Sequence, residues 1–278
     1  MYSFITHNDL IINEQFLDIL MRLKLDDFQS LLGFGGGSYI KKNPLRPVVR
    51  LQLEDKTFYL KRHFWPWKHV IKALRQRIRN EDARNEWENM TLLDKLGFNT
   101  MVPVAFGYKK RMGLPHCSLT LTEAIQDVEK LETYLPRHFF PPLSSDKIAG
   151  KRRLIRNLAA VARDFHDRGL NHQDFYLVHL FVRPEDEELF IVDLQRVHHK
   201  KKISAHDRIK DLAELAFSAR ALDIFTRTDF MRFAQAYLLK YRLDRTDKKM
   251  IGRILRKSGR IGRHTLKLIE RSRKASGV

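Results

Sequence analysis

The stretch Asn171-His172-Gln173-Asp174-Phe175-Tyr176-Leu177-Val178-His179, which we call the HQD loop, decides how the rest of the chain is interpreted. The segment before it, Asp146–Arg168, repeats apolar residues at helical spacing, and Gly169 ends the predicted helix. Two short apolar strands are predicted next, at Leu177–Val182, which begins inside the loop, and at Leu189–Leu194, and Asp193 stands at the edge of the second. Asp174 and Asp193 are nineteen residues apart, so the two carboxylates could face each other across a hairpin.

Two acids at such positions suit the chemistry of phosphoryl transfer. One carboxylate can orient an acceptor hydroxyl and take up its proton, while the other holds the Mg²⁺ that bridges the nucleotide phosphates. The motifs around them resemble those of the protein-kinase superfamily. His172-Gln173-Asp174 is similar to the H-R-D catalytic loop, with Gln in place of Arg, and Asp193-Leu194-Gln195 resembles a degenerate D-F-G.

The order of three motifs narrows this resemblance to one family. The HQD loop, then Val-Asp-Leu-Gln-Arg-Val from residue 192, then Lys-Asp-Leu-Ala-Glu-Leu from residue 210 are similar to the bacterial lipopolysaccharide core heptose(I) and Kdo kinases. The resemblance covers roughly residues 58–220, judged by motif order. It implies an α+β, bilobal protein-kinase-like fold with a β-rich N-lobe and a mainly helical C-lobe. We expect an N-terminal extension at 1–24, the N-lobe at 25–125 and the C-lobe at 126–278.

The N-terminal half supplies a candidate phosphate-binding lysine. Val49–Leu53 and Thr57–Lys61 alternate apolar and polar residues around a turn, which predicts a β-hairpin ending at Lys61. A kinase needs a lysine there to neutralise phosphate charge, and a glutamate on the next helix to pair with it. Glu86 shares a helical face with apolar residues and is the predicted partner, whereas Glu88 points away from that face. The alternative for Glu86 is a surface acid at the helix flank.

Two further segments are candidates for nucleotide binding. Glycines let backbone N–H groups approach phosphates closely, and a glycine cluster ending in Ser38 precedes the predicted hairpin. This cluster, Gly35, Gly36, Gly37 and Ser38, is equally well a flexible turn. The resemblance makes Glu123 and Ala124 the hinge whose backbone would bind adenine, and the alternative is a strand end that turns polar.

Four residues in or near the HQD loop complete the predicted site. The resemblance places Asp193 and His179 at the metal, although imidazole is a poor Mg²⁺ ligand compared with oxygen donors. His179 could bind the metal through a water, contact phosphate, or tolerate Mn²⁺ in place of Mg²⁺. His172 and Asp211 are expected to support the catalytic loop structurally. Asp211 also has a simpler interpretation, as an acid at the start of a helix.

The charge of the chain bears on its partners. There are 52 Lys and Arg against 33 Asp and Glu, a formal net charge of +19, and residues 248–274 hold eleven of the bases and one acid. A solvated basic helix, an anionic membrane surface, a polyanionic substrate and an acidic protein all fit this surplus. We see no recognised nucleic-acid-binding motif, so nucleic acid is not an expected partner. Cys117 is the only cysteine, which fits a reducing compartment.

The resemblance implies an ATP-dependent kinase that phosphorylates a heptose or Kdo of the lipopolysaccharide core, with Asp174 as catalytic base and lipid A or core sugars as acceptor. It places the enzyme in the cytoplasm, on the inner-membrane surface. Two alternatives remain open: another kinase-fold phosphotransferase acting on a protein or small molecule, and a non-catalytic pseudokinase or basic binding protein.

The remaining segments give further structural expectations. Residues 68–96 are predicted to be helical, and Val102–Tyr108 and Ser118–Glu123 to be strands. Pro136–Ser145 is predicted to be a loop because it is rich in proline. Everything after Asp207 is predicted to be helical.

Overall fold

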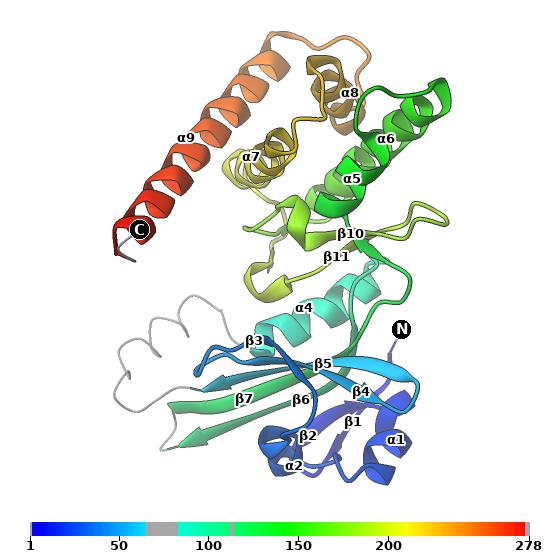
Figure 1. Cartoon of the computed structure of the whole chain (residues 1–278), viewed down its shortest axis with the longest axis vertical. Coiled ribbons are helices and arrows are strands. Elements are labelled where there is room, and N and C mark those ends of the chain that lie inside the picture. The colour runs from blue at the N-terminus through cyan, green and yellow to red at the C-terminus, as the bar shows by residue number, and fades with distance from the viewer. Residues whose placement is uncertain (1, 65–82, 112–113, 276–278) are drawn as a thin grey trace. The chain divides into compact units, whose positions relative to one another are not determined.

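The computed structural model describes residues 2–64, 83–111 and 114–275, and the side chains among these except those of residues 114–115 and 272–275. The chain forms two compact units (Figure 1). Unit 1 contains residues 1–126 together with 190–196, and unit 2 contains residues 127–189 and 197–278. The short segment 190–196 therefore leaves unit 2 and becomes part of unit 1.

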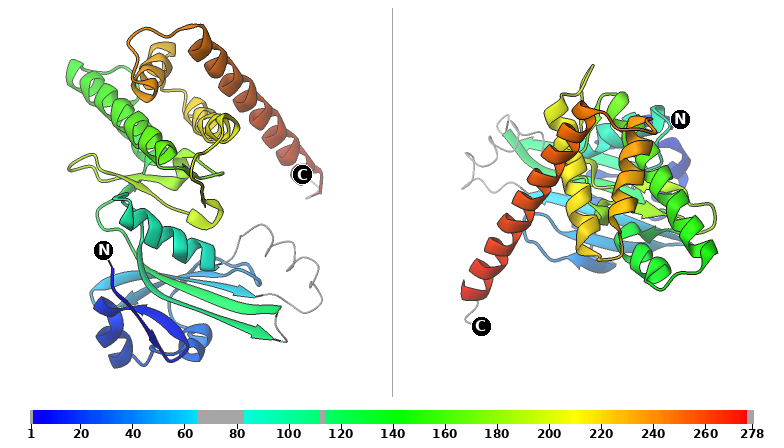
Figure 2. Two further views of the ribbon diagram at one scale, coloured as in Figure 1. Left: turned by 180° about the vertical axis from the view of Figure 1, so that it is seen from behind. Right: turned by 90° about the horizontal axis from the view of Figure 1, so that it is seen from above.

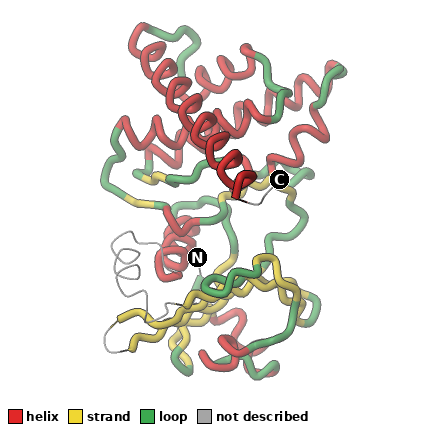
Figure 3. The backbone as a smooth tube through the Cα atoms, turned by 60° about the vertical axis from the view of Figure 1, so that its left-hand side comes forward, coloured by secondary structure: helices red, strands yellow, loops and turns green. Residues whose placement is uncertain are grey.

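Unit 1 is built on an antiparallel seven-stranded sheet in the order β1-β2-β6-β7-β5-β4-β3 (Figure 3, yellow). The predicted hairpin is confirmed as β4 and β5, with Lys61 opposite Val48. The two strands predicted at 102–108 and 118–123 are confirmed as β6 and β7. The strands before residue 48 were not predicted. The strands are β1 Phe4–His7, β2 Leu10–Asn13, β3 Ser38–Lys41, β4 Val48–Leu53, β5 Lys56–Phe64, β6 Val102–Arg111 and β7 Leu114–Glu123.

Helices cover both faces of this sheet. The 3₁₀ segment η1 (Glu14–Phe16) and the short helices α1 (Leu17–Arg22) and α2 (Phe28–Gly33) bury apolar side chains against one face, where Phe58 and Leu60 also point. Successive residues of a strand point to opposite faces, so Lys61 lies on the other face. That face is covered by α4, Ala83–Lys95 (Figure 1). The predicted helix from 68 to 96 is confirmed from Ala83 on, and its first part lies outside the described residues.

Unit 2 is mainly helical. Its long helices begin at side-chain caps, with Ser144 capping α6, and capping boxes of Ser204 with Asp207 on α7 and Thr226 with Asp229 on α8. Helix α9 packs along α7 (Figure 2). The helices are α5 Leu131–Phe139, α6 Ser145–Asp167, α7 Ala205–Ala221, α8 Arg227–Leu238 and α9 Arg245–Ala275. The short strands are β8 Glu129–Lys130, β9 Leu170–Asn171, β10 Leu180–Val182 and β12 His198–His199, with η3 at Leu177–His179; β11 is Leu189–Ile191 and η4 Leu194–Arg196.

Two predictions for these segments were wrong in part. Pro136 lies inside α5, where a loop was predicted. A proline removes one helical hydrogen bond, but Leu131, Tyr134 and Leu135 of this helix are buried, and their packing stabilises it. The strand predicted from Leu177 begins only at Leu180, because the preceding three residues form η3. Among the described helices, none is long and apolar enough to cross a bilayer, including the 31-residue α9.

The turn that leads into the HQD loop requires a glycine. Gly169 has φ +81°, and a Cβ at this position would lie 1.9 Å from the backbone oxygen of Lys200. We predict that Gly169→Ala destabilises the protein by at least about 2 kcal/mol, from backbone strain together with the clash. The measurement is chemical unfolding of the full chain.

Gly150, inside α6, provides the matched control, because its Cβ would meet only Phe139 Cε1, at an ordinary 3.7 Å, and an arginine tip at 4.0 Å. Gly150→Ala should stabilise the chain by about 0.5–1 kcal/mol through helix propensity. Equal effects of the two substitutions would contradict this account of the turn.

Candidate functional site

A buried ion pair lies at the centre of unit 1. Lys61 Nζ of β5 donates a hydrogen bond to Glu86 Oε1 of α4. Glu86 has no exposed surface, and it stands on the helical face that also buries Trp87 and Met90. A carboxylate in such surroundings is costly unless it is paired, so the lysine accounts for its presence among apolar side chains. The structure thus brings together the two residues that the sequence predicted as partners.

The segment 190–196 brings Asp193 to the same cluster. Hydrogen bonds anchor this segment, from Ile191 N to Asn99 O at 3.0 Å and from Asn89 Nδ2 to Leu194 O at 2.8 Å. Gln195 Nε2 donates to the second oxygen of Glu86 at 3.2 Å. Asp193 itself has φ +60°, a conformation that non-glycine residues rarely adopt.

The charge of Lys61 depends on these carboxylates. Burial favours the neutral amine, but the nearby charges of Glu86 and Asp193 outweigh that effect, and the pKa of Lys61 is raised above its ordinary value. The ammonium form is therefore held in place in a buried position. A fixed positive charge next to a carboxylate is an arrangement that can bind phosphate oxygens and a divalent cation.

The glycine cluster has a structural explanation at one position. Gly37 has φ +95°, and a Cβ there would lie 2.4 Å from the backbone oxygen of Arg50. The close approach of β3 to β4 therefore requires a glycine whether or not a phosphate binds. At Gly36 a Cβ would meet the Phe34 ring at 2.8 Å, whereas Gly35 has open space around it. Ser38 is the first residue of β3.

The segment predicted to bind adenine is engaged within the sheet. The backbone N–H of Ala124 donates to Thr57 O at 2.8 Å, and Glu123 forms an ion pair with Lys56 at 2.8 Å. A nucleotide that used the Ala124 N–H would have to replace this sheet hydrogen bond. The role of Glu123 and Ala124 in adenine binding stays a prediction.

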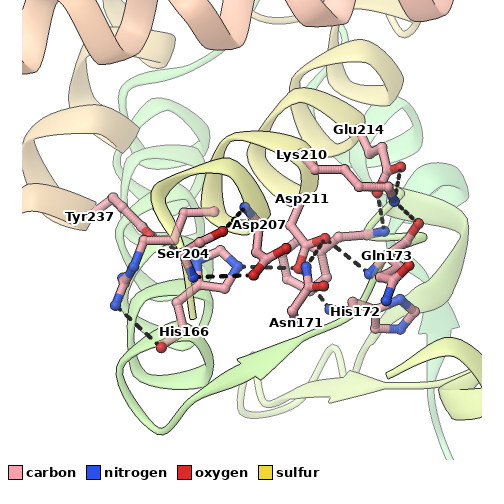
Figure 4. A network of polar contacts seen from close by, with 12 residues as sticks. His166, Asn171, His172, Gln173, Ser204, Asp207, Lys210, Asp211, Glu214 and Tyr237 are labelled. Carbon is pink, nitrogen blue, oxygen red and sulfur yellow. Dashed lines mark hydrogen bonds and ion pairs between the residues drawn. The ribbon is translucent and has the colours of Figure 1, made fainter. Parts of the chain in front are cut away.

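In unit 2, Asp211 of α7 fixes the start of the HQD loop (Figure 4). Its carboxylate is fully buried and accepts the backbone N–H groups of His172 at 2.7 Å and Gln173 at 3.0 Å. It also accepts Asn171 Nδ2 at 2.8 Å. Asp211 therefore contacts the loop directly. It does more than act as an acid near the start of α7.

A chain of hydrogen bonds through His166 and Tyr237 supports Asp211 on the side away from the loop backbone. His166 Nε2 lies 3.3 Å from Asp211 Oδ2, and its Nδ1 lies 2.8 Å from the hydroxyl of Tyr237. Arg208 donates to the same hydroxyl at 3.1 Å. Burial alone would raise the pKa of Asp211, but the hydrogen bond and charge of His166 and the His172 N–H lower it overall, so Asp211 is ionised at neutral pH.

His179 is oriented by the backbone carbonyl of Asp174. Its Nδ1 lies 2.7 Å from Asp174 O, and a carbonyl only accepts, so Nδ1 carries the proton. In the neutral ring the lone pair is then on Nε2, as in histidines that ligate metals. The ring stacks on the buried His172 at 5.9 Å between centroids, which gives His172 a packing role.

The donor chemistry bears on the predicted cation. The Asp193 carboxylate is a hard oxygen donor that suits Mg²⁺, whereas the His179 imidazole suits softer ions. Within the described residues, no cluster of three or more His, Cys, Asp or Glu side chains is poised to hold a metal by itself. Asp193 thus fits a cation that is also held by phosphates, as in kinases.

Sequence reasoning did not identify several residues that contact the site. Gln195 was noted only as a departure from D-F-G, and it bonds Glu86. Lys210, Glu214 and Ser218 contact the HQD loop from α7. The signal was available, because positions 211, 214 and 218 of a predicted helix share one face and all carry polar side chains in an otherwise apolar segment.

The sequence profile of the lipopolysaccharide kinase (Kdo/WaaP) family matches residues 44–237, more than half of the chain. The chain belongs to this family. A relative named lipopolysaccharide core heptose(I) kinase WaaP, from Escherichia coli strain K12, is 31% identical over 209 residues, which cover 72% of this chain and 77% of the relative. The protein of the same name from Pseudomonas aeruginosa is 30% identical over 223 residues, 76% of this chain and 80% of the relative.

A solved structure gives the corresponding comparison of the fold. WaaP in complex with acyl carrier protein matches with a TM-score of 0.70 and 25% identity, over 90% of this chain and 98% of that chain. The expected α+β kinase-like fold, with a β-rich N-terminal and a helical C-terminal part, is confirmed. Membership of the kinase family also confirms that the chain is a phosphotransferase.

The ion pair of unit 1 yields a test of coupling. Lys61→Met alone leaves Glu86 buried without its cation, and Glu86→Gln alone leaves the lysine with only the charge of Asp193 nearby. We predict that each single change lowers the free energy of unfolding, by about 3–5 kcal/mol for Lys61→Met, and that the double change costs less than the sum by about 1–3 kcal/mol.

Urea unfolding of the four proteins measures this cycle. Arg22 and Glu54, an exposed ion pair at 2.9 Å in the same unit, form the control pair and should show coupling of at most about 1 kcal/mol. Additive effects at Lys61 and Glu86 would count against the pair.

Proposed function

We propose that this chain transfers the terminal phosphoryl group of ATP to a hydroxyl of a heptose in the lipopolysaccharide inner core. Family membership and the names of the relatives support a heptose, and Kdo is the alternative sugar. The observation that carries the proposal is the buried Lys61–Glu86 pair beside Asp193, because a non-catalytic member has no need to bury this costly charge cluster.

Each residue has a distinct role in the proposed reaction. Asp174 accepts the proton of the attacking sugar hydroxyl and orients that hydroxyl toward phosphorus. Lys61, held by Glu86, binds phosphate oxygens of the nucleotide. Asp193, assisted by His179, would hold a Mg²⁺ ion, or Mn²⁺, which neutralises phosphate charge. The rate enhancement then comes mainly from positioning and electrostatics.

The role of Asp174 is tested by Asp174→Asn, which keeps the shape of the side chain and removes the proton acceptor. We predict that kcat falls at least about 100-fold while the melting temperature stays within a few degrees. The assay incubates ATP with dephosphorylated core oligosaccharide and follows the added phosphate by mass spectrometry, with fragmentation to locate the sugar.

Asp164→Asn is the matched control, because Asp164 is an exposed acid of unit 2 that pairs with Arg168. It should leave kcat unchanged. Phosphate transfer by Asp174→Asn at the wild-type rate would show that the HQD loop is not the catalytic loop. Phosphate found on a Kdo residue would replace heptose by Kdo as the acceptor.

Helix α9 supports a proposal about where the enzyme works. Its buried and half-buried positions include Asp247, Ile251, Ile254, Ser258 and Ile261, which recur at spacings of three and four. Four exposed arginines lie about 160–240° around the helix from the first of these positions, on the opposite face. We call them the arginine stripe: Arg253, Arg256, Arg260 and Arg263.

We propose that the arginine stripe binds the anionic surface on the cytoplasmic side of the bacterial inner membrane, where lipid A and core sugars are acceptors. Each basic residue near such a surface can contribute about 1 kcal/mol, an effect that salt screens. The enzyme would thus be peripheral, with the stripe concentrating it near its substrate.

Neutralising the stripe with four Arg→Gln changes should weaken binding to vesicles that contain anionic lipid by at least about 100-fold at low salt. Activity on soluble, delipidated core oligosaccharide should fall less than threefold. Vesicle cosedimentation over a salt series measures this, and wild-type binding should approach that of the variant as salt rises.

The control removes the same number of charges from exposed residues outside α9: Lys130, Lys147, Arg152 and Arg156. It separates the position of the charge from the net charge. Equal vesicle binding by the stripe variant and the wild type at every salt concentration would reject the membrane role.

An acidic protein is a second proposed partner. The solved WaaP structure contains acyl carrier protein, which is acidic, and the arginine stripe offers a complementary surface on this chain. Titration of the stripe variant with acyl carrier protein, in the absence of lipid, tests this separately from the membrane role.

A further inference from the structure

Three side chains on one face of α7 hold the backbone of the HQD loop. Asp211, Glu214 and Ser218 are separated by three and four residues, so they lie side by side along the helix. Asp211 accepts the N–H groups of His172 and Gln173, and Glu214 Oε2 accepts the N–H of Phe175 at 3.0 Å. Ser218 Oγ accepts that of Leu177 at 3.0 Å. Helix α7 thus binds the backbone of the loop on both sides of Asp174.

The contacts from α7 hold one residue of the loop in a strained backbone conformation. Gln173, which directly precedes Asp174, has φ +67°. A non-glycine residue in this region costs about 1–3 kcal/mol and persists only when its surroundings fix it. Its N–H donates to Asp211 Oδ1 at 3.0 Å, and its carbonyl accepts a hydrogen bond from Lys210 Nζ. Both ends of the strained residue are therefore held by α7.

Lys210 and Glu214 are also bonded to each other. Lys210 Nζ lies 2.6 Å from Glu214 Oε1, one turn along α7 (Figure 4). The two side chains are largely buried, with exposed fractions of 23% and 5%. Glu214 thus accepts from the loop with one oxygen and holds, with the other, the lysine that bonds Gln173. This pair completes a ring of contacts around the backbone of Asp174.

We propose that Lys210 and Glu214 are positioning residues for Asp174, and that the ionised form of Glu214 is required to keep the HQD loop in its catalytic arrangement. The inference rests on the proposed function of the loop. It adds that protonation of Glu214 would make catalysis depend on pH. Asp211 anchors only the start of the loop, whereas this pair fixes the residues on either side of Asp174.

The titration of Glu214 falls in the physiological range. Burial raises the pKa of Glu214 to about 7, although Lys210 and the Phe175 N–H favour the ionised form. Asp211, one turn away on the same helix, raises it further. From α7 the groups that act on Glu214 are Lys210 and Asp211, and from the loop it is the Phe175 N–H. Both hydrogen-bond partners of Glu214 are donors, so a protonated carboxyl has to turn its O–H toward one of them.

Protonation of Glu214 should change the stability of the fold and the rate of catalysis in opposite directions. The folded pKa of Glu214 lies above the ordinary value of 4.5, so the folded state binds the proton more tightly than the unfolded chain. This group therefore stabilises the fold increasingly as the pH falls from about 7 toward 4.5. Catalysis should move in the opposite direction, because protonation releases the loop.

The experiment compares the wild-type full chain with Glu214→Gln and Lys210→Gln. Steady-state transfer to soluble core oligosaccharide is measured between pH 5.5 and 8.5, and deuterium exchange is measured over the peptide covering 171–179. At pH 8, Glu214→Gln should lower kcat about 10- to 100-fold and leave the KM for ATP within twofold. Exchange in the 171–179 peptide should become at least tenfold faster. The acid limb of kcat near pH 7 should disappear in Glu214→Gln, and Glu214→Asp should restore part of kcat.

Two variants of an ion pair between α7 and the segment that precedes it are the matched controls. Lys200 and Asp207 interact at 2.9 Å at the start of the helix. Lys200→Gln and Asp207→Asn should leave kcat within twofold and exchange in the 171–179 peptide unchanged, although Asp207→Asn weakens the capping box of α7 and lowers the melting temperature.

Three results would overturn the proposal. The first is a kcat of Glu214→Gln within twofold of the wild type. The second is loop exchange in this variant that equals that of the wild type. The third is a loss of kcat matched by faster exchange across the whole of unit 2, which would indicate unfolding. A wild-type chain that transfers no phosphate to core sugars would refute the proposed function, and loop exchange would still test the role of the pair.

Discussion

The buried carboxylate of Asp211 is the interaction on which the catalytic unit depends. It accepts hydrogen bonds from two consecutive backbone N–H groups of the HQD loop and from Asn171, and it is supported by His166. A buried anion is tolerable only when most of its lone pairs are used, and here they are. Moving α7 along its axis by one residue would break these contacts together, so the packing of this helix and the shape of the loop are determined jointly.

Unit 1 applies the same principle with a different partner. Glu86 is buried like Asp211, but its compensation comes from a lysine on β5 and from Gln195, which is more than a hundred residues away in the sequence. Hydrogen bonds such as that from Asn89 Nδ2 to Leu194 O hold the segment 190–196 in unit 1. In both units a buried acid therefore organises backbone that local propensity alone does not fix. Asp193 and Gln173, both with positive φ, are the residues where strain is held.

The sequence predicted those parts of the structure that follow from local patterns. The hairpin to Lys61 and the helix through Leu154 and Leu158 were found because alternation and helical spacing are local signals. Glu86 was found because it interrupts an apolar face. The strands β1 and β2 form a local hairpin but were missed, because each is only four residues long, and β2 joins the sheet through β6, some ninety residues away. The α5 helix was missed because Pro136 outweighed a buried apolar face in the sequence pattern.

Glu214 and Ser218 on the polar face of α7 were not identified from the sequence, for a physical reason. Asp211 was identified through its motif, but Glu214 and Ser218 look like ordinary polar residues of an amphipathic helix. Their partners are backbone N–H groups, which carry no sequence signal, so side-chain patterns cannot predict them. What remains detectable is an inconsistency: acids and a serine on a face that the spacing of Leu212 and Leu215 predicts to be next to the core. A polar group in such a place needs a partner, and an irregular loop with unpaired amides is the natural one. The features that sequence reasoning left unexplained in this helix are therefore those that hold the loop bearing Asp174.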